Sequence, residues 1–267
     1  MERGQGVRPT YPVLFQLGDL QVRSYTVCML AAVLLGGWLT YREAERRGRL
    51  DDETLVVASF ALMGGVLGAK LGMIVFLGPG EFWRLLPTLP AHGAAWAGAF
   101  AGGLLTASLF ERLYGMERCI GDLAAPFLPL GQAIGRLGNF LAGDAYGATT
   151  RLPWGVYQGG AWRHPVQLYE LLLDLLLFVL LWRKRTRSFR DGELFRLYAI
   201  GYALIRFPLE FLRYQPAAQA LLGLTLVQWL CLAAVLGFGV QLVLIRRGVA
   251  CRCVAVPRLR RRGATAG

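Results

Sequence analysis

The chain has 267 residues, of which 55% are hydrophobic and only 17% charged, and its mean hydropathy is +0.44. A soluble domain usually carries about 25% charged residues, so this composition argues against an ordinary soluble protein. The formal net charge of +12 would suit a nucleic-acid-binding protein. The basic residues, however, lie in short blocks between long apolar stretches, so we predict an all-α integral membrane protein with no nucleic-acid partner.

Seven apolar segments are long enough to cross a bilayer, which takes about 20 residues per helix. They cover residues 24–41, 54–77, 93–110, 121–141, 166–182, 194–212 and 221–245. The connecting segments are short, so the sequence predicts seven transmembrane helices in a single membrane domain over residues 1–267. Residues 1–23 are expected to form an outer N-terminal segment, and residues 246–267 a basic cytoplasmic tail.

Basic residues follow every second apolar segment. After the first, third, fifth and seventh segments come Arg42, Arg46, Arg47, Arg49, Arg112, Arg118, Arg183, Lys184, Arg185, Arg187, Arg190, Arg246, Arg247, Arg252, Arg258, Arg260, Arg261 and Arg262. The alternate loops contain only Arg84, Arg151 and Arg163. Cytoplasmic loops of membrane proteins are enriched in Lys and Arg. This asymmetry predicts an N-terminus outside the membrane and a C-terminus in the cytoplasm.

Glycines recur every four residues in several of these segments. Gly64, Gly68 and Gly72 do so in the second, and Gly98 and Gly102 in the third. Small residues let membrane helices approach closely, so we predict tight packing of these helices. The chain has no internal repeat of the kind from which many transporters are built, which argues against transport.

Ionisable residues inside a membrane are costly and mark candidate functional sites. Lys70, Arg136 and the pair Arg206 and Glu210 lie inside predicted helices. With the predicted orientation, the three basic residues lie roughly 8–10 Å below the outer surface, at 1.5 Å per residue. Polar residues that approach the same level from the outer loops are Tyr25, Asn139, Asp144, His164, Gln167, Tyr169 and Glu170.

Four polar residues share one face of the sixth segment, because Tyr202, Arg206, Glu210 and Arg213 are spaced by four, four and three residues. Two interpretations are open. Arg206 and Glu210 would form an internal ion pair while Arg213 reaches toward the interface. Alternatively, the arginines bind an anionic phosphate, which matches the forked guanidinium. We predict a site for an anionic lipid headgroup in the outer leaflet.

Several motifs occur in an order that resembles the prolipoprotein diacylglyceryl transferases. The most specific are Gly135-Arg136-Leu137-Gly138-Asn139-Phe140, continuing through Gly143-Asp144 to Gly147, and His164-Pro165-Val166-Gln167-Leu168-Tyr169-Glu170. Others are Arg23-Ser24-Tyr25, Gly68-Ala69-Lys70-Leu71-Gly72, the set Tyr202, Arg206, Glu210, Phe211 and Arg213, and Gln228-Trp229. The resemblance extends over nearly the whole chain.

The resemblance implies a transferase of the bacterial cytoplasmic (inner) membrane. Phosphatidylglycerol would donate its diacylglyceryl group to the lipobox cysteine of a preprolipoprotein signal peptide, forming a thioether and releasing glycerol phosphate. Arg136 and Arg206 would hold the phosphate. Tyr25 and Asn139 would position the headgroup, and Glu210 would orient Arg206. Further substrate-binding residues at matching motif positions are Lys70, Asp144, Tyr202 and Arg213. No metal and no organic cofactor is implied.

The chain departs from the family pattern where the thiol needs a base. The family's Phe-His-Gly-Gly block is Trp96-Ala97-Gly98-Ala99 here, so Ala97 replaces the proposed catalytic histidine. His164 is the candidate for this role, and His92 is expected to be an interfacial loop residue. Two other functions remain open: a paralogue with a different acceptor, and a catalytically silent protein that binds anionic phospholipid.

Overall fold

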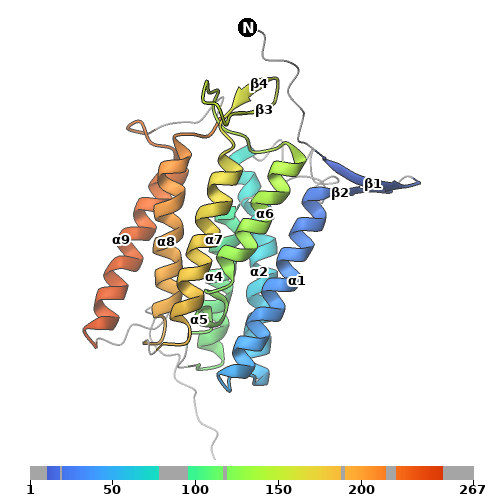
Figure 1. Cartoon of the computed structure of the whole chain (residues 1–267). Helices are drawn as coiled ribbons and strands as arrows, with labels where there is room; N and C mark the ends of the chain where they lie inside the picture. Colours follow the sequence, from blue (N-terminus) through green and yellow to red (C-terminus); the bar gives the residue numbers. More distant parts are fainter. Residues whose placement is uncertain are drawn as a thin grey trace, which may run out of the picture. The chain divides into compact units, whose positions relative to one another are not determined.

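The computed structural model describes residues 11–18, 20–77, 96–116, 119–187, 190–214 and 221–248 (Figure 1). Residues 1–10 of the predicted outer segment, residues 249–267 of the predicted tail, and His92 lie outside the described residues. The described residues form two compact units. The first lies within Met1–Glu43 and Ala124–Gly248, and the second within Ala44–Leu123.

The described residues are mostly helical. The helices are α1 (Ser24–Arg46), α2 (Asp52–Leu77), α4 (Trp96–Leu113), α5 (Gly121–Ala124), α6 (Leu128–Ala142), α7 (Val166–Lys184), α8 (Glu193–Glu210) and α9 (Leu226–Arg246). Each predicted apolar segment contains a helix, but the fourth is broken into α5 and α6. Pro126 lies in the break and Pro129 in the first turn of α6. Proline lacks the backbone N–H that a continuous helix needs.

Among the described residues, three helices are long and apolar enough to cross a membrane: Ser24–Arg46, Asp52–Gly72 and Leu226–Arg246. Their surfaces expose large apolar side chains, including Leu34 on α1 and Leu236 on α9. On α7, Leu172, Leu176 and Leu180 form an exposed row. Water-soluble proteins rarely expose such continuous apolar surface. The prediction of a helical membrane protein is confirmed in this respect, whereas the count of seven spans and their orientation stay predictions.

Two short antiparallel hairpins correct the all-α prediction. Strand β1 (Val13–Leu17) pairs with β2 (Leu20–Arg23), and β3 (Val156–Gln158) pairs with β4 (Ala161–Arg163). The second hairpin turns at Gly159 and Gly160, whose φ angles are 56° and 80°. Two successive positive φ angles suit a tight hairpin turn. Both hairpins lie outside the predicted spans, where strand pairing satisfies backbone groups that no helix uses.

In the second unit, α2 and α4 pack through their glycines. A Cβ atom on Gly102 would lie 2.9 Å from the Cα of Gly68, and one on Gly98 would lie 3.0 Å from the Cα of Gly72. Real Cβ atoms essentially never come closer to a neighbouring backbone than this, so a side chain at either position would force the helices apart. The predicted close packing of these two glycine-rich helices is confirmed.

In the first unit, α6, α7, α8 and α9 lie side by side, and the β3–β4 hairpin covers the end at which α6 and α8 finish and α7 and α9 begin (Figure 1). Helix α6 also contacts the start of α1, because a Cβ atom on Gly138 would lie 2.9 Å from the Cβ of Cys28 and 3.4 Å from the Cα of Tyr25. Each of the four neighbouring helices brings polar residues to this covered end.

Candidate functional site

Three arginines converge on the carboxylate of Glu170, which is 1% exposed. Arg136 Nη2 of α6 lies 2.7 Å from Glu170 Oε1, and Arg206 Nε of α8 lies 3.9 Å from the same oxygen. Arg213 Nη1, just after α8, lies 3.8 Å from Glu170 Oε2. The hydroxyl of Tyr202 donates a hydrogen bond to Glu170 Oε1 at 3.2 Å. We call Arg136, Arg206 and Arg213 the arginine cluster.

A second carboxylate orients Arg206. Its guanidinium pairs with Glu210 one turn further along α8, and the Thr225 hydroxyl donates a hydrogen bond to Glu210 Oε1 at 3.4 Å. Thr225 is also the N-cap of α9. The internal ion pair that one interpretation predicted is therefore present. Arg206 nevertheless remains available to a further group, because its Nη1 is buried and has no hydrogen-bond partner among the residues that the structure describes.

Arg213 is held by backbone pairing. The segment after α6 and the segment after α8 form an antiparallel bridge between Gly147 and Arg213, and the N–H of Ala148 donates to Leu212 O at 2.8 Å. Arg213 consequently turns toward Glu170 instead of reaching outward to the interface as the ion-pair interpretation expected. Burial and the neighbouring charges of Arg206 and Arg136 lower the pKa of Arg213 to about 10. The guanidinium still carries its charge at neutral pH.

The layer that covers the arginine cluster is built around Arg163. Its buried guanidinium donates to the carbonyl oxygens of Gln158 and Gly147 at 3.0 and 3.2 Å. It also contacts two neighbouring aromatic rings, 4.5 Å from the centroid of Tyr146 and 4.3 Å from that of Tyr214. A buried cation over aromatic faces is well stabilised. Arg163 thus organises the β3–β4 layer, and we assign it no contact with substrate.

In addition to Arg213, five predicted substrate-binding residues lie in the first unit: Tyr25, Asn139, Asp144, Tyr202 and Glu210. Tyr202 and Glu210 contact the arginines directly, as described above. Tyr25 is half-buried at the start of α1, where its backbone packs against Gly138. Asn139, the next residue, is half-buried, and its carbonyl accepts the N–H of Asp144 at 2.9 Å.

Asp144 and Lys70 are placed differently. The exposed carboxylate of Asp144 accepts the N–H of Ala145 at 2.7 Å, while its backbone carbonyl accepts Gln167 Nε2 at 2.8 Å. These two hydrogen bonds are typical of a residue in a turn. Lys70 is half-buried on α2, in the second unit. Its proposed role in binding substrate stays a prediction.

His164 connects the β3–β4 hairpin to α7. Its backbone N–H donates to Ala148 O at 3.0 Å, and its ring packs edge-on against Tyr169 at 6.3 Å between centroids. Within the described part of the chain, His164 Nδ1 is buried without a hydrogen-bond partner. An imidazole nitrogen can donate or accept one hydrogen bond. Ala97 is the second residue of α4.

Glu170 was predicted only as one of the polar residues that approach the level of Arg136 and Arg206, without a role, and Asp174 and Gln132 were not predicted. All three lie in the interior of the first unit, close to the cluster or one turn from it along the same helices. The signal for the two acids was present, because two carboxylates four residues apart interrupt the leucine-rich segment of α7. Acidic residues inside an apolar helix require partners.

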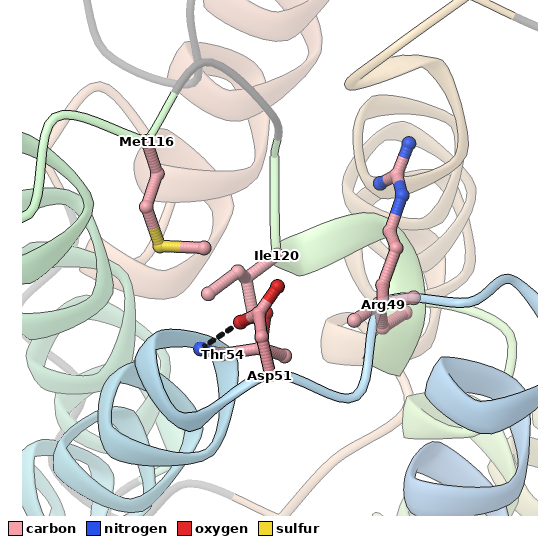
Figure 2. A pocket seen from close by; sticks show the side chains of 6 residues that line it. Arg49, Asp51, Thr54, Met116 and Ile120 are labelled. Atoms are coloured by element: carbon pink, nitrogen blue, oxygen red, sulfur yellow. Dashed lines mark hydrogen bonds between the residues drawn. The ribbon is translucent and has the colours of Figure 1, made fainter.

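The second unit has a small pocket of its own. It is lined by Arg49, Asp51, Thr54, Met116, Ile120 and Leu123 (Figure 2). Asp51 precedes α2, and its Oδ1 accepts the N–H of Thr54 at 2.7 Å. This is the pattern of a helix N-cap, which explains the carboxylate without a ligand.

The fold and the site define a helical membrane protein with a buried cluster of arginines around one carboxylate. The chain matches the family model described as prolipoprotein diacylglyceryl transferase over residues 12–245. It belongs to the prolipoprotein diacylglyceryl transferase family, as its motifs predicted, and the assignment as a transferase of lipoprotein biosynthesis is confirmed with it.

Relatives share about a third of their residues with this chain over most of its length. The phosphatidylglycerol–prolipoprotein diacylglyceryl transferase of Legionella pneumophila (strain Paris) is 33% identical over 244 residues, which cover 87% of this chain and 93% of the relative. The enzyme of the same name from Bordetella avium (strain 197N) is 35% identical over 260 residues, covering 88% and 95%. That of Nitratidesulfovibrio vulgaris (strain DP4) is 35% identical over 238 residues, covering 84% and 88%.

Proposed function

We propose that this protein transfers the diacylglyceryl group of phosphatidylglycerol to the lipobox cysteine of preprolipoprotein signal peptides. The observation that carries the proposal is the convergence of Arg136, Arg206 and Arg213 within one buried site. Three guanidinium groups face the carboxylates of Glu170 and Glu210 there. Guanidinium groups bind phosphate oxygens in a forked geometry, and a phosphodiester headgroup brings the single negative charge that such a site accommodates.

In the proposed reaction, the cysteine thiolate attacks the glyceryl carbon that bears the phosphate. The S–C bond forms, the C–O bond to the phosphate breaks, and the diacylglyceryl group remains attached to sulfur as a thioether. Glycerol phosphate leaves with one additional negative charge on its phosphate. Arg136 and Arg206 stabilise this developing charge, because they are already oriented by Glu170 and Glu210 and need no rearrangement. Tyr25 and Asn139 position the headgroup.

The thiol proton needs an acceptor, and we infer that His164 supplies it in place of the residue at position 97. His164 Nδ1, which is buried without a hydrogen-bond partner in the part of the chain that the structure describes, supports this role. Free cysteine has a pKa of about 8.5, so a base near the thiol increases the thiolate fraction at neutral pH. The proton then leaves with the glycerol phosphate.

The experiment that tests the function is direct. The purified protein in vesicles containing phosphatidylglycerol is incubated with a lipobox peptide, and the peptide mass is measured. A gain of one diacylglyceryl group on a cysteine peptide, with none on the matched serine peptide, is expected. A protein that binds phosphatidylglycerol but modifies neither peptide would instead be a lipid-binding relative or a paralogue with a different acceptor.

We expect Ala97→His to raise the transfer rate or to move its optimum to lower pH, because a second imidazole would help to remove the thiol proton. General-base assistance is worth about 10²–10⁴-fold when the base is well aligned. Ala97→Gln is the matched control, since it adds similar volume without basicity. Identical pH profiles for the two variants would rule out a base at this position. His164→Ala should lower the rate while leaving lipid binding unchanged.

We also propose seven membrane spans, with the N-terminus outside and the C-terminus in the cytoplasm, so that the arginine cluster lies at the outer face of the inner membrane. The distribution of basic residues supports this orientation. A reporter fused after Gly248 is expected to read as cytoplasmic, and one inserted at Gly160 as exported. The opposite pair of signals would place the site at the inner leaflet and overturn the proposed acceptor.

A further inference from the structure

A second layer of polar residues lies one helical turn deeper than the arginine cluster. Gln132 precedes Arg136 by four residues on α6, and Asp174 follows Glu170 by four residues on α7. Helices α6 and α7 run in opposite directions (Figure 1), so both residues lie further from the covered end, by about 6 Å along the helix axes. Asp174 is 0% exposed. We call Gln132 and Asp174 the inner polar pair.

The carboxylate of Asp174 makes no hydrogen bond within the described part of the chain. Both of its oxygens are buried without a hydrogen-bond partner there, and Glu170 Oε2 and Arg206 Nη1 at the neighbouring level are in the same state. Gln132 is half-buried, and its side chain meets the hydroxyl of Tyr198. An unsatisfied buried polar atom costs about 1–3 kcal/mol. Four such atoms on two helices are therefore a large cost, which a bound polar group would remove.

The electrostatic surroundings connect this pair to the cluster. Asp174 interacts with Glu170, Arg136 and Arg206, and Gln132 lies beside the hydroxyl of Tyr198. The pair is thus part of the same site and not an isolated defect in the bundle.

The unsatisfied atoms indicate which chemical group fits. Three of them are acceptors (the two oxygens of Asp174 and Glu170 Oε2), and one is a donor (Arg206 Nη1). A group rich in donors satisfies this set. An ammonium group is repelled by the nearby guanidinium charges of Arg136 and Arg206. Hydroxyl groups donate and accept without a charge, and they match the set best.

We propose that Gln132 and Asp174 bind the hydroxyl groups of the lipid headgroup whose phosphate the arginine cluster holds, and so select a polyol phosphate. This inference rests on the proposed function, because the phosphate must be seated on Arg136 and Arg206. A headgroup that lacks hydroxyls would leave these four buried atoms unsatisfied. Sites built to bind a hydroxyl group reject the analogue without it by large factors, up to about 10⁴–10⁵.

The test is equilibrium binding of three lipids with identical acyl chains by the full-length protein in detergent. The lipids are phosphatidylglycerol, phosphatidylpropanol, which has the same headgroup length without hydroxyls, and phosphatidylethanolamine. Wild-type protein is expected to prefer phosphatidylglycerol to phosphatidylpropanol by about 10²-fold or more. In Asp174→Leu combined with Gln132→Leu, the preference should fall to less than about tenfold, mainly through weaker binding of phosphatidylglycerol.

Stability separates recognition from a structural role. Replacing a buried carboxylate that has no partner by an apolar residue is expected to leave the unfolding midpoint of the lipid-free protein unchanged or raised. Glu193→Gln is the matched control, because Glu193 lies at the first residue of α8, at the opposite end of that helix from Arg206. Glu193 is also buried, but it pairs with Lys184 and Arg246, each at 3.2 Å. Its replacement should lower the midpoint without changing the lipid preference.

Equal binding of phosphatidylglycerol and phosphatidylpropanol by the wild-type protein would overturn the inference, as would an unchanged preference in the double variant. A double variant that unfolds would overturn it too, because the pair would then be structural. Asp174→Asn, which keeps the shape, should retain the fold and weaken the preference. A normal preference together with no transfer to a lipobox peptide would contradict the proposed function alone.

Discussion

Arg206→Ala is expected to lower the rate of diacylglyceryl transfer by on the order of 10²–10³-fold or more, which is the loss seen when one donor to a developing oxyanion is removed. Arg206 lies next to the carboxylate of Glu170, and its Nη1 is buried with no hydrogen-bond partner in the described ranges. Arg136→Ala should have a comparable effect, since Arg136 approaches the same oxygen of Glu170. Arg206→Lys should also be poor, because an ammonium group cannot reproduce the forked contact with phosphate.

The control for these variants is Arg246→Ala at the opposite end of the bundle. Arg246 is 57% exposed and pairs with Glu193, so its loss should change neither lipid binding nor transfer. Each variant is measured for lipid transferred per minute to a lipobox peptide, after size-exclusion chromatography has established that it is folded. Transfer rates close to wild type in both Arg136→Ala and Arg206→Ala would eliminate the arginine cluster as the phosphate site.

Glu170→Ala is expected to be the most destabilising single change in the first unit. It removes the one carboxylate on which all three arginines converge, and it leaves their charges buried without compensation. Breaking a buried ion pair in this way costs about 3–5 kcal/mol. The measurement is the midpoint of thermal unfolding in detergent. Asp174→Asn is the comparison on the same helix, because Asp174 has no hydrogen bond to lose.

The unfolding midpoint of Glu170→Ala can also be measured with and without anionic lipid. A ligand that binds the folded state stabilises it in proportion to its occupancy, and the uncompensated positive charge of the variant should bind anionic headgroups. Phosphatidylglycerol is therefore expected to restore more stability to Glu170→Ala than an uncharged lipid does. A variant as stable as wild type would show that Glu170 does not hold the cluster together.

The sequence by itself was sufficient for the membrane character, the positions of the helices and the family. These properties depend on local information: a run of about 20 apolar residues, the glycines at four-residue spacing that bring α2 and α4 together, and motifs that are contiguous in the chain. Arg136, Arg206 and Glu210 could be identified for the same reason. An ionised residue within an apolar segment is anomalous whatever surrounds it.

Local signals were also present for features that the sequence analysis missed. Gly159-Gly160 is a strong hairpin signal, and Pro126 and Pro129 mark the break between α5 and α6. Asp174 interrupts a leucine-rich segment in the same way that Arg136 interrupts its own. These omissions concern detail within segments that were otherwise placed correctly.

The partners of the charged residues were decided by the tertiary structure alone. Arg136 has no acidic residue within reach on its own helix, and its partner Glu170 lies 34 positions away on α7. Arg213 was expected to reach the interface, but the bridge to Gly147 turns it inward. The physical reason is that an ion pair depends on the distance between two side chains, and a sequence specifies that distance only within one helix. Between helices it is set by packing, here by Gly138 against α1 and by the bundle that brings α6, α7 and α8 around Glu170.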